Sequence, residues 1–286
     1  MRTKNISIHI SEVYQNLTKS EKKIADFITS NPYDAQYMSI TSLAEECNVA
    51  DATISRFCRS LGYQSYNEFK LALAKHMAPS TTMANIPPEG KPTATDSVSN
   101  MAQKLYIAND RAMKQSLDLI NPKQITLAAK YLYNANRVYC FGQGGSGILA
   151  KEAWARFISV SPRFQCIEDN HMQIMAASLC DTTDVILFFS YSGATRDIVD
   201  ILKIAKESGA RVILITHFPK CPAAIYADVI ILCGSKESPL HGGSIAAKIG
   251  QLFLIDVLFN EYCRFNPDQY TTNRELTSEA LANKHV

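Results

Sequence analysis

Hydrophobic positions divide the chain into two kinds of pattern. Through residues 5–77 they keep an approximate helical period, as at Val13, Leu17, Ile24 and Ile28. From residue 137 onward, helical patterns alternate with short β-rich runs at residues 137–141, 163–167, 185–189, 212–216 and 229–232. Such alternation is typical of βαβ units. We therefore predict an all-α domain, followed by an α/β domain with a mostly parallel five-stranded sheet flanked by helices.

A change of composition separates the two patterns. Residues 78–95 contain four prolines and a glycine among serines and threonines, as an exposed linker does. We place the first domain at residues 1–78, the linker at 79–96, and the second domain at 97–286 with a core at about 128–268. Further helices are expected over 97–117, 121–134 and about 244–262, whereas the tail from Pro267 is polar. Thr18 and Glu21 stand at capping-box spacing, and Asn31-Pro32 should end the helix that begins there.

Two short segments of the first domain share one apolar spacing, i, i+3, i+4, i+7. They are Ile40, Leu43, Ala44 and Cys47, and then Ile54, Phe57, Cys58 and Leu61. Residues 48–51 form a turn between them, with Asp51 as the expected N-cap of the second helix and Gly62 as the residue that ends it. Two short helices joined by a tight turn predict a helix-turn-helix.

The opposite face of the second helix carries the residues expected to bind DNA. Ala52, Ser55, Arg56 and Arg59 follow the same spacing, and Thr53 lies near that edge. Short polar side chains near the helix start, with long donors behind them, suit base edges and phosphates. A plain helical bundle with a solvated basic face remains the alternative. The net charge of +2 neither demands nor excludes nucleic acid.

Composition places the chain among ordinary globular proteins, with 47% hydrophobic and 20% charged residues. Eight cysteines occur with no C-x-x-C spacing, which favours buried thiols in a reducing cytoplasm. The sequence has no apolar signal core and no clean run that could span a bilayer, so we expect a cytoplasmic protein. Its histidines show no metal-ligand spacing, and we predict no metal.

Two loops rich in glycine and serine follow predicted strands of the second domain. They cover residues 142–147 (GQGGSG) and 190–195 (SYSGAT), and a helix follows each. A loop that opens a helix at the carboxyl end of a parallel strand presents backbone N–H groups to an anion. The hydroxyls of the second loop add further donors. The pair predicts a site for a phosphate monoester.

Other interpretations of these loops stay open. Gly142-x-Gly144-x-x-Gly147 fits a dinucleotide fingerprint, with Glu168 after the next strand as the acid for a ribose hydroxyl. That interpretation leaves the hydroxyls of the second loop unexplained. A Walker P-loop is disfavoured because neither loop ends in Gly-Lys-Ser/Thr. The loops could also be tight strand-to-helix turns.

The residues also carry a family resemblance. Residues 42–63 closely resemble the helix-turn-helix of the RpiR family of bacterial regulators, whose pattern matches Ala52-Thr53, Arg56-Phe57-Cys58 and Leu61-Gly62 here. Ala50 departs from it, because the family usually has Ser there, and the lost hydroxyl removes a cap or a phosphate contact. The two loops, with Asp184 and residues 209–216, resemble the sugar isomerase (SIS) domain over roughly residues 105–265.

The resemblance implies a regulator rather than an enzyme. It assigns the phosphate and sugar hydroxyls to Ser146, Ser190, Ser192 and Thr195, lined by Tyr191 and approached by the backbone of Gly144, Gly145 and Gly193. We expect a cytoplasmic bacterial repressor, a homodimer or homotetramer, that binds a double-stranded DNA operator and responds to a phosphorylated sugar. No cofactor and no catalytic residue are expected.

Isomerase activity remains the enzymatic alternative, because some SIS domains act on sugar phosphates. Such a reaction needs a general base and often a histidine for ring opening. The candidates are Glu168, Asp169, His171, Glu237 and His241, and nothing in the sequence places any of them against a substrate.

Overall fold

The first part of the chain is a set of short helices. The structure, a computed structural model, describes residues 6–77, 92–235 and 244–282. The contacts divide the chain into two compact units: the described residues up to Asp110, with Ser244, belong to the first, and residues 111–235 and 245–282 belong to the second. Of the predicted linker, residues 79–91 lie outside the described residues. The helices of the first unit up to Met77 are α1 (Ile6–Val13), the 3-10 helix η1 (Tyr14–Asn16), α2 (Lys19–Ser30), α3 (Pro32–Ala35), α4 (Ile40–Glu46), α5 (Asp51–Ser60) and α6 (Tyr66–Met77).

The predicted start and end of α2 are confirmed. Glu21 N donates to Thr18 Oγ1 at 3.4 Å, and Thr18 N donates to Glu21 Oε2 at 2.9 Å, which makes a capping box. Asn31 is the C-cap, and Pro32 begins the next helix. These contacts satisfy N–H groups that the first helical turn leaves without partners.

The apolar stripes of these helices meet in one core. Ile24, Leu43, Ile54, Phe57 and Phe69 are at most 1% exposed. Fully burying a side chain of this size contributes about 1.5–3 kcal/mol, so the core stabilises helices that would be marginal alone. Cys47 and Cys58 pack there as thiols, and burial raises their pKa values to about 11 and about 12.

The rest of the described chain alternates helices and strands, as predicted. Its elements are α7 (Val98–Asp118), α8 (Pro122–Asn134), β1 (Val138–Gly142), α9 (Gly145–Ile158), β2 (Phe164–Cys166), α10 (Asn170–Ser178), β3 (Val185–Phe189), α11 (Arg196–Glu207), β4 (Arg211–Thr216), η2 (Ala224–Tyr226), β5 (Val229–Leu232), α12 (Ile245–Cys263) and α13 (Pro267–Ala282). The five strands form one sheet in the order β2-β1-β3-β4-β5, and every pair is parallel.

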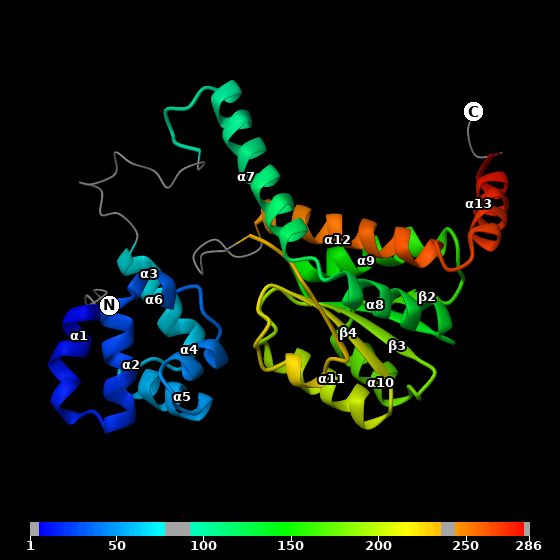
Figure 1. Cartoon of the computed structure of the whole chain (residues 1–286). Coiled ribbons are helices and arrows are strands. Elements are labelled where there is room, and N and C mark those ends of the chain that lie inside the picture. Colours follow the sequence, from blue (N-terminus) through cyan, green and yellow to red (C-terminus); the bar gives the residue numbers. More distant parts are fainter. Residues whose placement is uncertain (1–5, 78–91, 236–243, 283–286) are drawn as a thin grey trace. The chain divides into compact units, whose positions relative to one another are not determined.

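Helices cover both faces of this sheet (Figure 1). Alternate strand residues, such as Leu187 and Ile213, pack with α8, α9 and α12 on one face. Their neighbours Ile186 and Val212 pack with α10 and α11 on the other. The central strands are therefore apolar on both sides, which explains their continuous hydrophobic runs.

The polar tail from Pro267 forms α13, which the sequence analysis did not predict. None of its residues is buried. It is held by polar contacts, in which Asn273 Nδ2 donates to Val160 O at 2.7 Å and Thr277 Oγ1 donates to Ser159 O at 3.0 Å, and by Tyr270, which packs against the core beside Phe259. A helix without an apolar stripe gives no periodic signal. Within the described ranges, no helix is long and apolar enough to cross a membrane.

Candidate functional site

The second helix of the helix-turn-helix is α5, and it begins one residue earlier than expected. Ala50 is its N-cap, with no side-chain hydrogen bond. The prediction of Asp51 as N-cap was wrong, because Asp51 is the first helical residue and its Oδ2 accepts from Thr41 Oγ1 at 3.0 Å. The acidic side chain in the first turn still suits the helix dipole. Gly62 follows the C-cap Leu61 at φ +83°, as predicted.

The predicted DNA-binding face of α5 is largely open. Ala52, Arg56 and Arg59 are exposed, and Ser55 is half-buried. Thr53 is only 8% exposed, and its Oγ1 accepts from Arg56 Nη2 at 3.3 Å. Thr53 therefore orients the Arg56 guanidinium in this structure, and the exposed side chains of the predicted face are those of Ala52, Arg56 and Arg59.

The first glycine loop joins β1 to α9. Gly144 is the N-cap of α9 at φ +53° and ψ −124°, a region that side chains with a β-carbon rarely adopt. Ser146 N donates to Gln143 O, and Gly147 N donates to Gly144 O. The Ser146 side chain is half-buried and makes no hydrogen bond to any residue that the structure describes. The loop thus opens α9 with a hydroxyl and a positive dipole end at its start.

The second loop joins β3 to α11. Ser190 is 3% exposed, and its Oγ accepts from Gly193 N at 3.0 Å. Ser192 Oγ accepts from Ala194 N at 3.4 Å. Gly193 has φ +57°, and a β-carbon there would overlap Cys221 Sγ. Thr195 is the exposed N-cap of α11, and its side chain makes no capping bond, so the first N–H groups of α11 keep donor capacity.

The sheet topology brings the two loops together. Gly142 at the end of β1 is the register partner of Phe189 at the end of β3. The strand order reverses at this point, and ligands of open α/β sheets bind at such switch points. A polar chain also joins the loop regions, because Gln143 Nε2 donates to Asn170 Oδ1 at 2.5 Å and Asn170 Nδ2 donates to Asp197 Oδ2 at 3.1 Å. The two loops that contain the residues predicted for phosphate binding therefore leave the sheet at the same edge.

Lys248 on α12 is a residue that sequence reasoning missed. A β-carbon on Gly145 would lie 3.4 Å from Lys248 Cε and 3.6 Å from its Nζ. The ammonium group therefore lies against the first residue of α9. No local signal in the sequence could have placed a residue so distant in the chain beside the loop. With Lys248, the site combines two helix N-termini, hydroxyls and a positive charge.

Gln173 supports the first loop from beneath. It is fully buried, and its Nε2 donates to Gly142 O at 3.3 Å and to Ile167 O at 2.7 Å. Its Oε1 is buried without a hydrogen-bond partner in the described structure. These contacts join the end of β1 to the segment after β2.

Two of the candidate acid–base residues, Glu168 and Asp169, are engaged in other contacts. Glu168 Oε1 pairs with Lys151 Nζ at 2.7 Å, and Asp169 caps α10 by accepting from Met172 N at 3.0 Å. His171 is exposed on α10. Glu237 and His241 lie outside the described residues. Among those described, no group of three or more His, Cys, Asp or Glu side chains could hold a metal ion.

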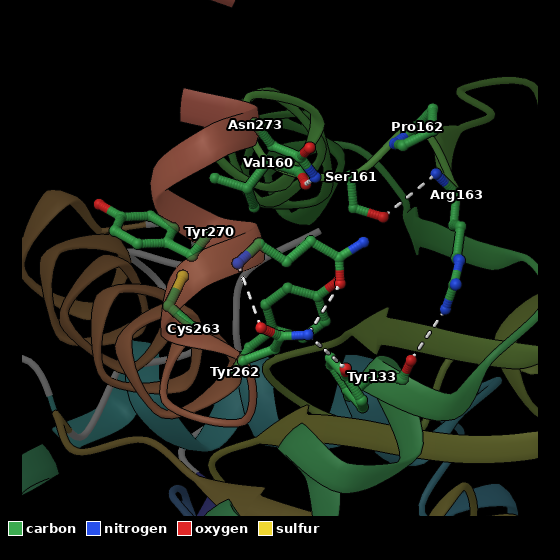
Figure 2. A pocket seen from close by; sticks show the side chains of 11 residues that line it. Tyr133, Val160, Ser161, Pro162, Arg163, Tyr262, Cys263, Tyr270 and Asn273 are labelled. Carbon is green, nitrogen blue, oxygen red and sulfur yellow. Dashed lines mark hydrogen bonds between the residues drawn. The ribbon is translucent and has the colours of Figure 1, made fainter. Parts of the chain in front are cut away.

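A cavity of about 310 Å³ lies beside α13 (Figure 2), and no residue of the two loops lines it. Its lining includes Tyr133, Arg163, Tyr262 and Asn273. Arg163 directly precedes β2, so the cavity is at the amino-terminal edge of the sheet. Arg163 Nη1 already donates to Tyr133 O at 2.9 Å and to Ala135 O at 3.1 Å. This cavity therefore does not belong to the predicted phosphate site.

Comparison with protein families gives two matches. Residues 4–80 match the helix-turn-helix domain of the rpiR family, and residues 131–261 match the SIS domain. Over 99% of its length, the chain is 34% identical to an uncharacterized HTH-type transcriptional regulator of Haemophilus influenzae, of which 98% is covered. It is 28% identical to the HTH-type transcriptional regulator RpiR of Escherichia coli, with 92% of this chain and 88% of that protein covered.

A solved structure shares the fold along the chain. The Vibrio vulnificus NanR protein complexed with ManNAc-6P is 24% identical, with a TM-score of 0.88 and coverage of 99% of this chain and 100% of that one. The sugar isomerase domain of an RpiR transcription factor from Sphaerobacter thermophilus has a TM-score of 0.57 at 18% identity, covering 63% of this chain and 98% of that one.

Proposed function

Because this chain belongs to the RpiR family of helix-turn-helix transcriptional regulators, we propose that α5 binds operator DNA and that the loops after β1 and β3 bind a phosphorylated sugar that modulates this binding. One observation carries the second half of the proposal. The adjacent strands β1 and β3 are each followed by a loop rich in glycine and hydroxyl residues that opens a helix, and the strand order reverses between these two strands. Two helix N-termini at one edge of the sheet can donate to the same phosphate, which two turns far apart could not do.

The phosphate has complementary charge and donors at this site. The N-termini of α9 and α11 present N–H groups, and Ser146, Ser192 and Thr195 add hydroxyls. Asp197 in the first turn of α11 opposes an anion, and we propose that the Lys248 ammonium offsets it. A dianionic phosphate gains most where a cation and a helix N-terminus act together. NanR, which shares this fold, was solved with ManNAc-6P, and this supports a sugar phosphate as the ligand class.

We propose that α5 makes the base and phosphate contacts of the operator complex. Arg56 and Arg59 would donate to base edges or phosphates, and Ser55 would contact the duplex near the helix start. A second copy of the chain would supply the other half-site, about one helical turn away. We propose repression, relieved when the sugar phosphate favours an arrangement with lower operator affinity.

We propose that the SIS domain of this chain binds its sugar phosphate without turning it over. Glu168 is engaged in an ion pair, and Asp169 in a helix cap. The chain is also similar along nearly its whole length to proteins named as transcriptional regulators. An isomerase would convert the bound sugar phosphate, and NMR of the incubated ligand would detect the product.

Separable variants test the proposal. Thermal shift would be measured against glucose 6-phosphate, ribose 5-phosphate, N-acetylmannosamine 6-phosphate, the matching free sugars and inorganic phosphate, because a ligand of the native state raises the melting temperature. Fluorescence anisotropy would follow binding to a duplex selected from a random pool. Arg56→Ala should weaken duplex binding about tenfold or more and leave the thermal shift intact.

Ser192→Ala and Lys248→Met should do the reverse, each weakening sugar-phosphate binding about tenfold. Ser278→Ala on α13 and Lys203→Ala on α11 are matched controls on exposed surfaces. Loss of duplex binding and of the thermal shift together, in folded Arg56→Ala or Ser192→Ala protein, would contradict two separable sites. No shift with any sugar phosphate in the wild type would refute the effector half.

A further inference from the structure

We propose that the last two turns of α7 receive the effector signal from both loops and that Tyr191 and Gln115 form the bond path from the second loop. The inference rests on the proposed function, since it concerns regulation by the same site. It begins with contacts other than the phosphate donors and the DNA-binding face proposed above.

Tyr191 lies between Ser190 and Ser192 in the second loop, and both its ends are fixed. Its hydroxyl donates to Ser235 O at 2.8 Å. Its ring stacks on His217, with centroids 5.0 Å apart and an angle of 5° between the planes. Its carbonyl accepts from Thr216 Oγ1 at 3.1 Å and from His217 N at 3.0 Å. A shift of the loop backbone therefore carries the ring and the segment that the hydroxyl contacts.

That segment, which follows β5, is bonded to α7. Ser235 N donates to Gln115 Oε1 at 2.9 Å, and Gly234 N donates to Ser116 Oγ at 2.9 Å. A β-carbon on Gly234 would lie 2.5 Å from Gln115 Cβ and 2.6 Å from Ser116 N, so the two backbones are in close contact. Tyr191, Ser235 and Gln115 thus form a continuous chain of hydrogen bonds from the second loop to α7.

The first loop reaches the same turns of α7 through α12. Lys248 lies against Gly145, at the start of α9. Two residues further along α12, a β-carbon on Gly250 would lie 2.6 Å from Ser116 Oγ and 3.3 Å from Ala112 O. Ser116 and Ala112 are at most 1% exposed, although most of α7 is exposed. Both loops are therefore connected to one buried contact on α7, centred on Ser116.

The position of α7 in the chain links the contact at Ser116 to the helix-turn-helix domain. α7 is one unbroken helix from Val98 to Asp118, and it follows the helix-turn-helix domain in the sequence. Close-packed contacts such as Gly234–Ser116 and Gly250–Ser116 tend to switch between discrete arrangements rather than deform gradually. When a phosphate draws the two loops toward it, the packing around Ser116 shifts, and α7 carries that shift toward its amino end.

Gln115→Ala tests this path in the full-length protein. Gln115 is exposed and has no place in either binding site, so we expect operator affinity without effector and sugar-phosphate affinity without DNA to stay within about twofold of wild type. The coupling ratio, operator Kd at saturating sugar phosphate divided by operator Kd without it, should fall about fivefold, the factor that one net hydrogen bond represents. Gln103→Ala, on an exposed position of the same helix, is the matched control.

Tyr191→Phe adds a second readout, because it keeps the ring stacked on His217 and removes the hydroxyl. The double variant with Gln115→Ala should lower the coupling ratio no further than one variant alone, since both break the same path. The probe is the member of the sugar-phosphate panel that gives the largest thermal shift. A wild-type coupling ratio that persists in Gln115→Ala would overturn the inference alone. A wild type without any sugar-phosphate response would overturn the proposed function and the inference with it.

Discussion

Gly193→Ala should destabilise the SIS domain through a single contact. A new β-carbon at Gly193 would overlap Cys221 Sγ and lie 3.0 Å from Cys221 Cβ, and the residue has φ +57°. Holding a side chain in that backbone region costs about 1–2 kcal/mol, and overpacking a buried site costs about 1–3 kcal/mol. Because Cys221 is 2% exposed, its thiol has little room to move. We expect the free energy of unfolding to fall by about 2–5 kcal/mol.

Urea unfolding followed by tryptophan fluorescence would measure this loss. The chain has one tryptophan, Trp154 on α9, so the fluorescence signal reports on the α/β domain. A double-mutant cycle with Cys221→Ala measures the cost of the overlap, because the smaller side chain removes Sγ and leaves the approach of the two β-carbons and the backbone strain. We expect Gly193→Ala and Cys221→Ala to be coupled by about 1–3 kcal/mol.

Gly209→Ala is the matched control for this cycle. Gly209 has φ +93°, and its nearest neighbour is Thr182 rather than Cys221. Its cycle with Cys221→Ala should show additive effects, as distant sites do. A Gly193→Ala variant that unfolds at the wild-type urea concentration, or a cycle without coupling, would refute the reasoning about this contact.

Three further predictions concern local energetics. Ala50→Ser should give α5 the side-chain cap that it lacks and raise the stability of the helix-turn-helix domain by about 0.5–1 kcal/mol; an unchanged melting temperature by circular dichroism would speak against it. Burial lowers the pKa of Lys70 to about 8, so its charge destabilises the fold below pH 8 and this cost fades as pH rises toward 10. Lys70→Met should therefore be more stable than wild type at pH 7 by about 1 kcal/mol and lose the advantage by pH 10, whereas a constant difference would point to packing. Arg137→Ala should destabilise the α/β domain by about 2–4 kcal/mol in urea unfolding, because Arg137 Nη2 donates at 2.6 Å to the fully buried Asp184 carboxylate. Adding Asp184→Asn to this variant should recover part of the lost stability, because it removes the unpaired buried charge. A double variant that is no more stable than Arg137→Ala would contradict this explanation.

Local patterns predicted most of the elements. The capping box of α2, the stripes of α4 and α5 and the apolar runs of β1 to β5 each depend on residues close in sequence. The error at Asp51 is of one residue, because the backbone conformation of Ala50 decides which residue caps the helix. α13 was missed because it lacks an apolar stripe and is held by the single aromatic Tyr270 and by polar contacts to residues about 115 positions earlier.

The candidate site shows the same division. Its serines and glycines were predicted, since loops that open helices after strands have a recognisable composition. Two contacts were not predicted. The orientation of the Arg56 side chain by Thr53 depends on side-chain rotamers, and the packing of Gly193 on Cys221 depends on a loop distant in the sequence.

The sequence by itself determined the kind of protein: a helix-turn-helix domain, an α/β domain and two glycine- and serine-rich loops that open helices, all coded by periodicity and by short motifs. Tertiary structure alone decided the strand order that brings the loops together and the position of Lys248 beside Gly145. It also decided the contact of Ser116 with Gly234, 118 residues away, which joins the segment after β5 to α7. The physical reason is that periodicity specifies which face of an element is buried, whereas the partner of that face is chosen by packing of the whole domain.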